Sequence, residues 1–233
     1  MNKAFKGLYK EKKVLVTGHT GFKGSWLAIW LKELGADVID YSLAPPSVPS
    51  NFEAAKLQDR MTHVHGDIRD LDRLIETFKK YQPEFVFHLA AQPWQHVLEP
   101  LSDYLWLGAL LSQDPKKYSG AWNFGPDDGS HLTVAGMVKK LIQYWGNGSW
   151  EDLSDPKALH EAKLLKLCCD KAHDALNWYS VLTIDECLRM TAEWYKEFYS
   201  ETQTKDMHQF CVEQIRKYEG SAATKNVMYA QSE

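Results

Sequence analysis

The chain has 233 residues, with hydrophobic residues at 44% and charged residues at 25%, as in globular proteins of one large domain or two small ones. Its 27 Lys and Arg against 31 Asp and Glu give a formal net charge of −4, which argues against a nucleic-acid partner. No apolar run is long enough to cross a membrane, and the first residues lack the apolar core of a signal peptide. We therefore expect a cytoplasmic protein with no membrane partner.

The first part of the chain, residues 13–92, is predicted to alternate strands with helices. The expected strands are Lys13–Val16, Asp37–Tyr41, Thr62–Gly66 and Glu84–Leu89, and the expected helices are 22–34 and 70–80. The last strand contains Phe85-Val86-Phe87, which is apolar on both faces, as in a buried parallel strand. This alternation predicts an α/β fold.

The second part, residues 94–200, is predicted to be mainly helical. Apolar residues recur with helical spacing along Leu132–Trp145 and Ile184–Tyr199, and six of the nine Trp lie at or beyond position 106. A packed C-terminal lobe is expected from this pattern. From Ala222 onward no strong pattern remains, so the domains predicted are 1–93, 94–221 and a flexible tail over 222–233.

The spacing of the cysteines and histidines does not predict a metal site. Cys168 and Cys169 are adjacent and the other two cysteines stand alone, so a reducing compartment with free thiols is expected. His63 and His65 would share one strand face, but no third ligand lies at a suitable spacing. The sequence therefore predicts no metal.

A glycine-rich turn is the most informative feature of the chain. The segment Thr17-Gly18-His19-Thr20-Gly21-Phe22-Lys23-Gly24-Ser25 joins the first predicted strand to the first predicted helix. Strand, glycine turn and helix are the context that a dinucleotide-binding fingerprint requires. Gly18 permits the tight turn, Gly21 lets the backbone approach a pyrophosphate, and Gly24 allows close packing of helix on strand. The fold predicted is thus a Rossmann-type parallel sheet of about four strands, in the order 3-2-1-4, with a mainly helical C-terminal lobe.

The spacing G-x-x-G-x-x-G resembles the extended short-chain dehydrogenase/reductase superfamily. Further segments resemble one family within it, the CDP-glucose 4,6-dehydratases. These segments are Tyr41–Pro46, Gly66–Asp70, Phe87–Pro93, Trp94–Leu101, Trp122–Pro126 and His160–Ala162. The resemblance implies an NAD-dependent enzyme that converts CDP-glucose to CDP-4-keto-6-deoxyglucose in deoxysugar biosynthesis.

The same resemblance indicates a large internal deletion. Two blocks that lie far apart in the family, H-L-A-A-Q-P and P-W-Q-H-V-L-E-P, are fused here at Pro93-Trp94. About three strand–helix units, on the order of 150 residues, would be missing, so the resemblance implies that the Rossmann-type sheet is truncated. The family's catalytic Tyr-x-x-x-Lys pair lies in that stretch. The single Tyr-x-x-x-Lys match here, Tyr9 to Lys13, precedes the first strand, so no catalytic residue is assigned.

Carried over from the family, the cofactor contacts fall at the strand ends and the glycine turn. They are Gly18, Thr20, Gly21, Phe22 and Gly24 at the pyrophosphate, Asp67 and Ile68 at the adenine, and Leu89, Ala90 and Ala91 beneath the ribose and nicotinamide. Asp40, 22 residues after Gly18, is a candidate for the ribose-binding acid or simply a strand end. NAD binding is expected to be weak or partial.

Substrate contacts implied by the resemblance are Trp94, Gln95, His96, His160 and Glu161. Two function classes stay open: an impaired NAD-dependent dehydratase, and a non-catalytic nucleotide-binding or interaction protein derived from one. The expected ligand is a nucleotide or nucleotide-sugar. Because the deletion uncovers the edge of the fourth strand, we also expect a homo-oligomer or association with a full-length relative.

Overall fold

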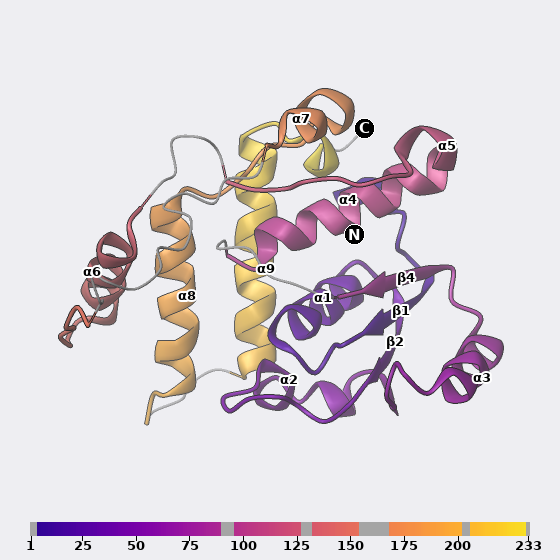
Figure 1. The fold of residues 1–233 in the computed structure, drawn as a ribbon, viewed down its shortest axis with the longest axis horizontal. Helices are drawn as coiled ribbons and strands as arrows, with labels where there is room; N and C mark the ends of the chain where they lie inside the picture. Colours follow the sequence, from indigo (N-terminus) through magenta and orange to yellow (C-terminus); the bar gives the residue numbers. More distant parts are fainter. Residues whose placement is uncertain (1–3, 90–95, 127–131, 154–167, 202–205, 232–233) are drawn as a thin grey trace.

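The computed structural model describes residues 4–89, 96–126, 132–153, 168–201 and 206–231. Its sheet comprises four parallel strands, β1 Lys13–Thr17, β2 Asp37–Ser42, β3 Thr62–His65 and β4 Phe85–His88. They are ordered β3-β2-β1-β4, and helices cover the sheet and form most of the C-terminal part (Figure 1). The predicted α/β fold, strand order and helical C-terminal part are therefore confirmed.

The remaining elements are helical. They are η1 Ala4–Gly7, α1 Phe22–Glu33, α2 Asn51–Ala54, η2 Leu57–Asp59, α3 Leu71–Tyr81, α4 Leu98–Gln113, α5 Pro115–Tyr118, α6 Val134–Trp145, α7 Asp170–Leu176, α8 Ile184–Phe198, α9 Met207–Thr224 and η3 Met228–Ala230. Side-chain caps fix several of their starts. Asp70 accepts from the backbone N–H of Arg73 at the start of α3, and Thr183 with Glu186 forms a capping box at α8.

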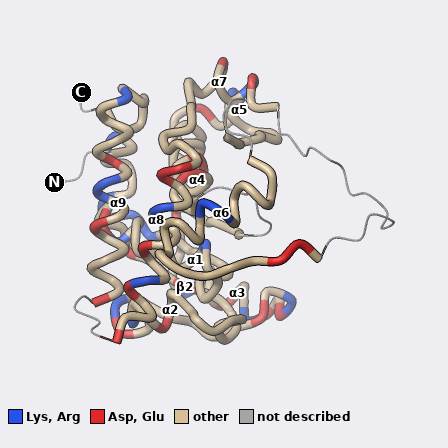
Figure 2. The backbone as a smooth tube through the Cα atoms, turned by 90° about the vertical axis from the view of Figure 1, so that its left-hand side faces the viewer, with Lys and Arg blue, Asp and Glu red and all other residues tan. Residues whose placement is uncertain are grey.

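α1 is the central helix of the larger core. All residues from Gly24 to Leu31 are buried, which is typical of a helix enclosed on every side. Trp30 packs edge-on against Tyr218 of α9, and its indole N–H donates to Glu219 at 2.8 Å. Acidic and basic residues are interspersed along α9 (Figure 2). The sheet and the C-terminal helices thus share one hydrophobic core.

The two faces of the sheet are covered differently. Side chains of Val14, Val16 and Val38 belong to the larger core with α1. Leu15, Ile39 and Tyr41, on the opposite face, form a small second cluster that Leu74 and Tyr81 of α3 complete. α3 leaves Ile75 40% and Phe78 37% exposed. The face beneath α3 is therefore only partly covered.

The segment from residue 222 differs from its prediction as a flexible tail. α9 continues to Thr224, and η3 follows with Val227 and Tyr229 buried. The Tyr229 ring stacks on Phe5 with ring centroids 4.9 Å apart. The segment is anchored because the Tyr229 side chain, which belongs to no periodic pattern, is buried against Phe5 of η1 near the start of the chain.

Candidate functional site

The glycine turn between β1 and α1 has the geometry that close approach of a ligand requires. Gly18 has φ +75°, in the left-handed region that favours glycine. A Cβ on residue 24 would lie 2.3 Å from the carbonyl oxygen of Gly18 and 2.4 Å from the Cα of His19. Gly21 precedes α1 as its N-cap residue. The turn thus holds the start of α1 tightly against the end of β1.

The N-terminus of α1 has no side-chain cap. The backbone N–H groups of its first turn and its positive dipole end face the glycine turn, as in phosphate-binding helices. Phe22, the first residue of the helix, is 46% exposed. Thr20 lies 2.7 Å from Ser42 through their hydroxyl oxygens, which ties the turn to the end of β2. The predicted pyrophosphate contacts are therefore brought together at one strand edge.

The predicted adenine segment follows β3. The Tyr41 hydroxyl donates to the carbonyl oxygen of Asp67, and the Tyr41 ring occupies the space where Gly66 would carry a Cβ. Asp67 accepts two hydrogen bonds from the Arg69 side chain at 3.0 Å, and this pairing lowers the pKa of Asp67 to about 2. Ile68 is 49% exposed. Asp67 is therefore ionised at neutral pH and held by its own loop.

Asp40, the candidate ribose acid, is fully buried. Its carboxylate lies 3.9 Å from His19 Nε2, and His19 in turn lies 2.9 Å from His63 Nδ1. Burial raises the pKa of Asp40 and lowers that of His19 to about 3, so burial disfavours the charged form of each group. In this arrangement the carboxylate does not face a ribose. His19, within the glycine motif itself, supports the turn from below.

At the end of β4, Leu89 lies beside the glycine turn. Its carbonyl oxygen is 3.6 Å from where Gly18 would carry a Cβ. Thr17 Oγ1 and His88 Nδ1 are 2.7 Å apart and join the ends of β1 and β4. Six predicted site residues lie outside the described residues: Ala90, Ala91, Trp94, Gln95, His160 and Glu161.

His96 is placed in the core rather than at an open surface. It is 4% exposed, its ring lies edge-on to Trp26 at 6.0 Å, and burial lowers its pKa to about 3. The backbone N–H of Leu98 donates to its Nδ1 at 3.4 Å. His96 therefore packs in the core against α1.

Two acidic residues of α4 are buried and were not predicted from the sequence. Glu99 accepts from the backbone N–H groups of Val181 and Leu182, and burial raises its pKa to about 7. Asp103, one turn further on, is fully buried, and burial raises its pKa as well. The sequence signal that could have indicated them is the i, i+4 spacing of two acids within a mostly apolar helix. Glu99 joins α4 to the loop before α8.

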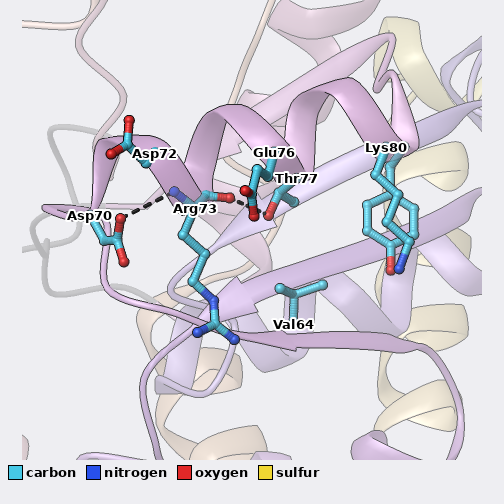
Figure 3. Close-up of a pocket in the computed structure, with 8 residues that line it drawn as sticks. Val64, Asp70, Asp72, Arg73, Glu76, Thr77 and Lys80 are labelled. Carbon is cyan, nitrogen blue, oxygen red and sulfur yellow. Dashed lines mark hydrogen bonds between the residues drawn. The ribbon is translucent and has the colours of Figure 1, made fainter.

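A separate pocket of about 470 Å³ opens between β3 and α3 (Figure 3). Its lining contains both acidic and basic side chains. They are Asp70, Asp72, Arg73, Glu76 and Lys80, beside Val64, Thr77 and Tyr81. Arg73 extends from the helix toward Val64 in the figure. The pocket lies along the flank of α3, away from the glycine turn.

The described residues hold no group of three or more His, Cys, Asp and Glu side chains placed to bind a metal ion. Within the same ranges, every helix is too short or too polar to cross a membrane. Tyr9, of the single Tyr-x-x-x-Lys match, is buried and donates to the carbonyl oxygen of Leu105 at 2.6 Å. Tyr9 is therefore a core residue.

The glycine turn, the parallel sheet and the uncapped helix start together define a Rossmann-like α/β unit. Residues 14–104 match the sequence model of the NAD dependent epimerase/dehydratase family. Over a longer stretch, the chain is similar to a CDP-glucose 4,6-dehydratase. It is 27% identical to CDP-glucose 4,6-dehydratase of Salmonella typhimurium, over 82% of this chain and 92% of that protein.

Other relatives match over shorter stretches. CDP-paratose 2-epimerase of Salmonella typhi is 36% identical over 81 residues, which are 34% of this chain and 24% of that protein. Among solved structures, a UDP-glucose 4-epimerase of Thermotoga maritima aligns with a TM-score of 0.54 at 16% identity, over 81% of this chain and 100% of that one. A dTDP-glucose 4,6-dehydratase of Bacillus anthracis aligns with a TM-score of 0.51 at 12% identity, over 81% of this chain and 97% of that one. These structures are similar in fold.

The alignment with CDP-glucose 4,6-dehydratase is longer than the chain itself. It runs over 331 positions, whereas 82% of 233 residues is about 190, which leaves about 140 positions of the alignment with no counterpart here. This matches the size of the deletion expected from the sequence. The expected join at Pro93-Trp94 lies outside the described residues.

Proposed function

We propose that this chain binds adenine nucleotides through the adenosine and pyrophosphate half of an NAD site and does not turn over CDP-glucose. The observation that carries the proposal is the close approach of Gly24 to Gly18, which leaves the uncapped start of α1 facing the end of β1. Backbone N–H groups at such a helix start bind phosphate oxygens without any catalytic side chain. The proposed ligand class, adenine nucleotides, is supported by the match to a family of NAD-dependent enzymes.

The adenine end of the proposed site lies at the loop after β3. Asp67 would accept from the exocyclic amine and Ile68, half-exposed, would pack on the ring. Arg69, which holds Asp67, leaves the carboxylate ionised and able to accept. Leu89, with Ala90 and Ala91, would lie beneath the ribose. Asp40 would support the glycine turn rather than bind the nucleotide, because its carboxyl group lies 3.9 Å from His19 of the turn.

The nicotinamide end of the proposed site would lack the Tyr-x-x-x-Lys pair that the resemblance to the family implies. Tyr9, of the one Tyr-x-x-x-Lys match, packs in the core. Loss of a general acid–base group alone reduces rates by about 10²–10⁴. If about 3 kcal/mol of cofactor binding is lost with the missing stretch, affinity for NAD falls on the order of 100-fold. Trp94, Gln95, His160 and Glu161 remain proposed contacts of a nucleotide-sugar, whereas His96 packs in the core beside Trp26.

Calorimetric titration with AMP, ADP and NAD tests this half-site. ADP should bind more tightly than AMP, because its second phosphate reaches the start of α1. NAD should bind no more than about tenfold more tightly than ADP, a difference of about 1.4 kcal/mol. NAD binding 100-fold more tightly than ADP would contradict the proposal, because the nicotinamide pocket would then be complete.

A second candidate function is dehydratase activity itself. It is favoured by the similarity to CDP-glucose 4,6-dehydratase, which extends over 82% of the chain. The purified chain with NAD and CDP-glucose should give neither NADH-like absorbance nor a 4-keto product. Formation of the 4-keto sugar at a rate that depends on the concentration of this chain would establish the second function and remove the first.

A further inference from the structure

The outer edge of β4 is open within the described sheet, because β4 has only β1 as a neighbour. The backbone N–H of Glu84 donates to the carbonyl oxygen of Lys13 at 2.8 Å, so residue 84 directs its backbone groups toward β1. Directions alternate along a strand. The N–H and C=O groups of Phe85 and Phe87 therefore point outward, toward the open edge.

A groove of about 460 Å³ runs along this edge. It is lined by Glu84, Phe85, Val86, Phe87, His88 and Leu89 on one side and by Tyr104, Leu107, Gly108, Leu111 and Ser112 of α4 on the other. In Figure 1, β4 is the strand of the sheet nearest α4. The groove thus joins unused backbone groups to an apolar wall.

The sequence of the edge is self-complementary. In Glu84-Phe85-Val86-Phe87-His88, two phenylalanines flank the central valine, and the two ends are an acid and an imidazole. We propose that β4 pairs antiparallel with β4 of a second copy of this chain, about a two-fold axis through Val86. Such an interface is isologous, since the same residues meet from both copies.

The backbone groups fit this register. With Val86 on the axis, Phe85 lies opposite Phe87 of the second copy, and these two residues exchange both N–H···O bonds. Phe87 and the second copy's Phe85 do the same. Val86 then falls at a non-hydrogen-bonded pair, which agrees with its backbone groups pointing toward β1. The four outward-facing groups of each copy are all used.

The ends of the strand supply charge complementarity. In the same register, Glu84 lies opposite His88 of the second copy, on the face of the sheet that carries Val86. Side chains in such non-hydrogen-bonded pairs are close, so the Glu84 carboxylate can accept a hydrogen bond from the His88 imidazole of the second copy. Glu84 already receives a hydrogen bond from Lys12 at 2.6 Å, which keeps its pKa below the ordinary range. It therefore remains an acceptor for the imidazole.

Apolar side chains lie on both faces of the proposed junction. Val86 is 46% exposed and would meet its own copy on the face that α3 covers incompletely. On the other face Phe87 packs beside Tyr9 and Gly108, under α4. A two-fold axis perpendicular to the sheet places both copies of α4 on this side, with Leu107 and Leu111 over the paired phenylalanines. The pairing thus continues the sheet and covers its apolar edge.

Replacement of Val86 tests the interface directly. In Val86→Lys two ammonium groups would meet on the axis, while the monomer keeps its fold because the side chain is half-exposed. Sedimentation equilibrium should show a dimer for the unmodified chain and at least about a tenfold weaker dimer for V86K. The matched control, Val48→Lys at a 92% exposed loop position, should leave the dimer unchanged.

A cross-link separates loss of pairing from loss of folding. Val86→Cys in a Cys168→Ser background should form an intermolecular disulfide on mild oxidation, since Cα atoms of a non-hydrogen-bonded pair lie about 4.5 Å apart. Ile75→Cys, equally exposed on α3, should not form one. A stable monomer at high concentration would overturn the proposal. So would a dimer that V86K leaves intact, or cross-linking only when a full-length dehydratase is added. None of these results depends on nucleotide binding.

Discussion

The carbonyl oxygen of Gly18 lies 2.3 Å from where residue 24 would carry a Cβ, so the turn and the first turn of α1 leave no room for a side chain. Backbone atoms line this contact, and backbone cannot rotate away as a flexible side chain can. The contact explains why a glycine stands inside an otherwise apolar helix. It also fixes the direction of α1 relative to the end of β1.

Gly24→Ala should therefore destabilise the fold by about 1–3 kcal/mol, the usual range for overpacking, and should abolish ADP binding. Urea unfolding and calorimetry measure the two effects. Gly220→Ala is the matched control, because no atom lies within 4 Å of a Cβ there and the residue is inside α9. It should stabilise the chain by about 0.5–1 kcal/mol. Equal effects of the two substitutions would contradict the close contact.

Glu99→Gln should flatten the dependence of stability on pH between about 4.5 and 7. Burial raises the pKa of Glu99 to about 7 from an unfolded value near 4.5, so its protonated form favours the folded state. That contribution is fully present below the unfolded pKa and is lost as pH rises through 7. Between pH 5 and 8 the original chain should lose about 2 kcal/mol more than the variant. Denaturant unfolding at both pH values measures this, and parallel curves would contradict it.

His96→Gln should act in the opposite pH range. Burial lowers the pKa of His96 to about 3, so the unfolded chain takes up a proton near pH 6.5 and the folded chain does not. The stability contributed by the neutral ring is present above 6.5 and is lost as pH falls. From pH 7.5 to 5 the original chain should lose about 2 kcal/mol more than the variant, in which an amide oxygen can still accept from Leu98. An unchanged acid slope in the variant would show that His96 is protonated in the fold.

Gly66→Ala should be rescued by a second substitution. A Cβ on residue 66 would lie 2.4 Å from the Tyr41 ring, which is fully buried. We expect a loss of about 1–3 kcal/mol for the single variant. Tyr41→Leu removes the ring, so the double variant should lose less than the sum of the two single changes. Additive losses in unfolding measurements would mean that the ring does not block residue 66.

The sheet could be predicted from sequence because its signals are local. Val14-Leu15-Val16 and Phe85-Val86-Phe87 are short apolar runs bounded by polar residues, and Gly18, Gly21 and Gly24 mark one turn. In all four strands, each end lies within one residue of its predicted position. Parallel order followed from the alternation of strands and helices.

Features that depend on distant contacts were not predicted. Tyr229 is ordered by stacking on Phe5, more than two hundred residues away, and no local pattern records that contact. Asp40 matches the spacing of a ribose-binding acid, yet its side chain points into the core beside His19. Strand alternation sets which face a residue lies on, whereas burial depends on which helix covers that face.

The most direct test of the proposed function is calorimetric titration of ADP into the original chain and into Phe22→Glu. Phe22 begins α1 and is 46% exposed, so a carboxylate there suits the helix dipole and leaves the fold intact while it repels a phosphate. We expect saturable ADP binding to the original chain and to the control Phe22→Leu, and at least about tenfold weaker binding to the glutamate variant. Equal ADP affinity in all three proteins, or none in the original chain, would contradict nucleotide binding at the glycine turn.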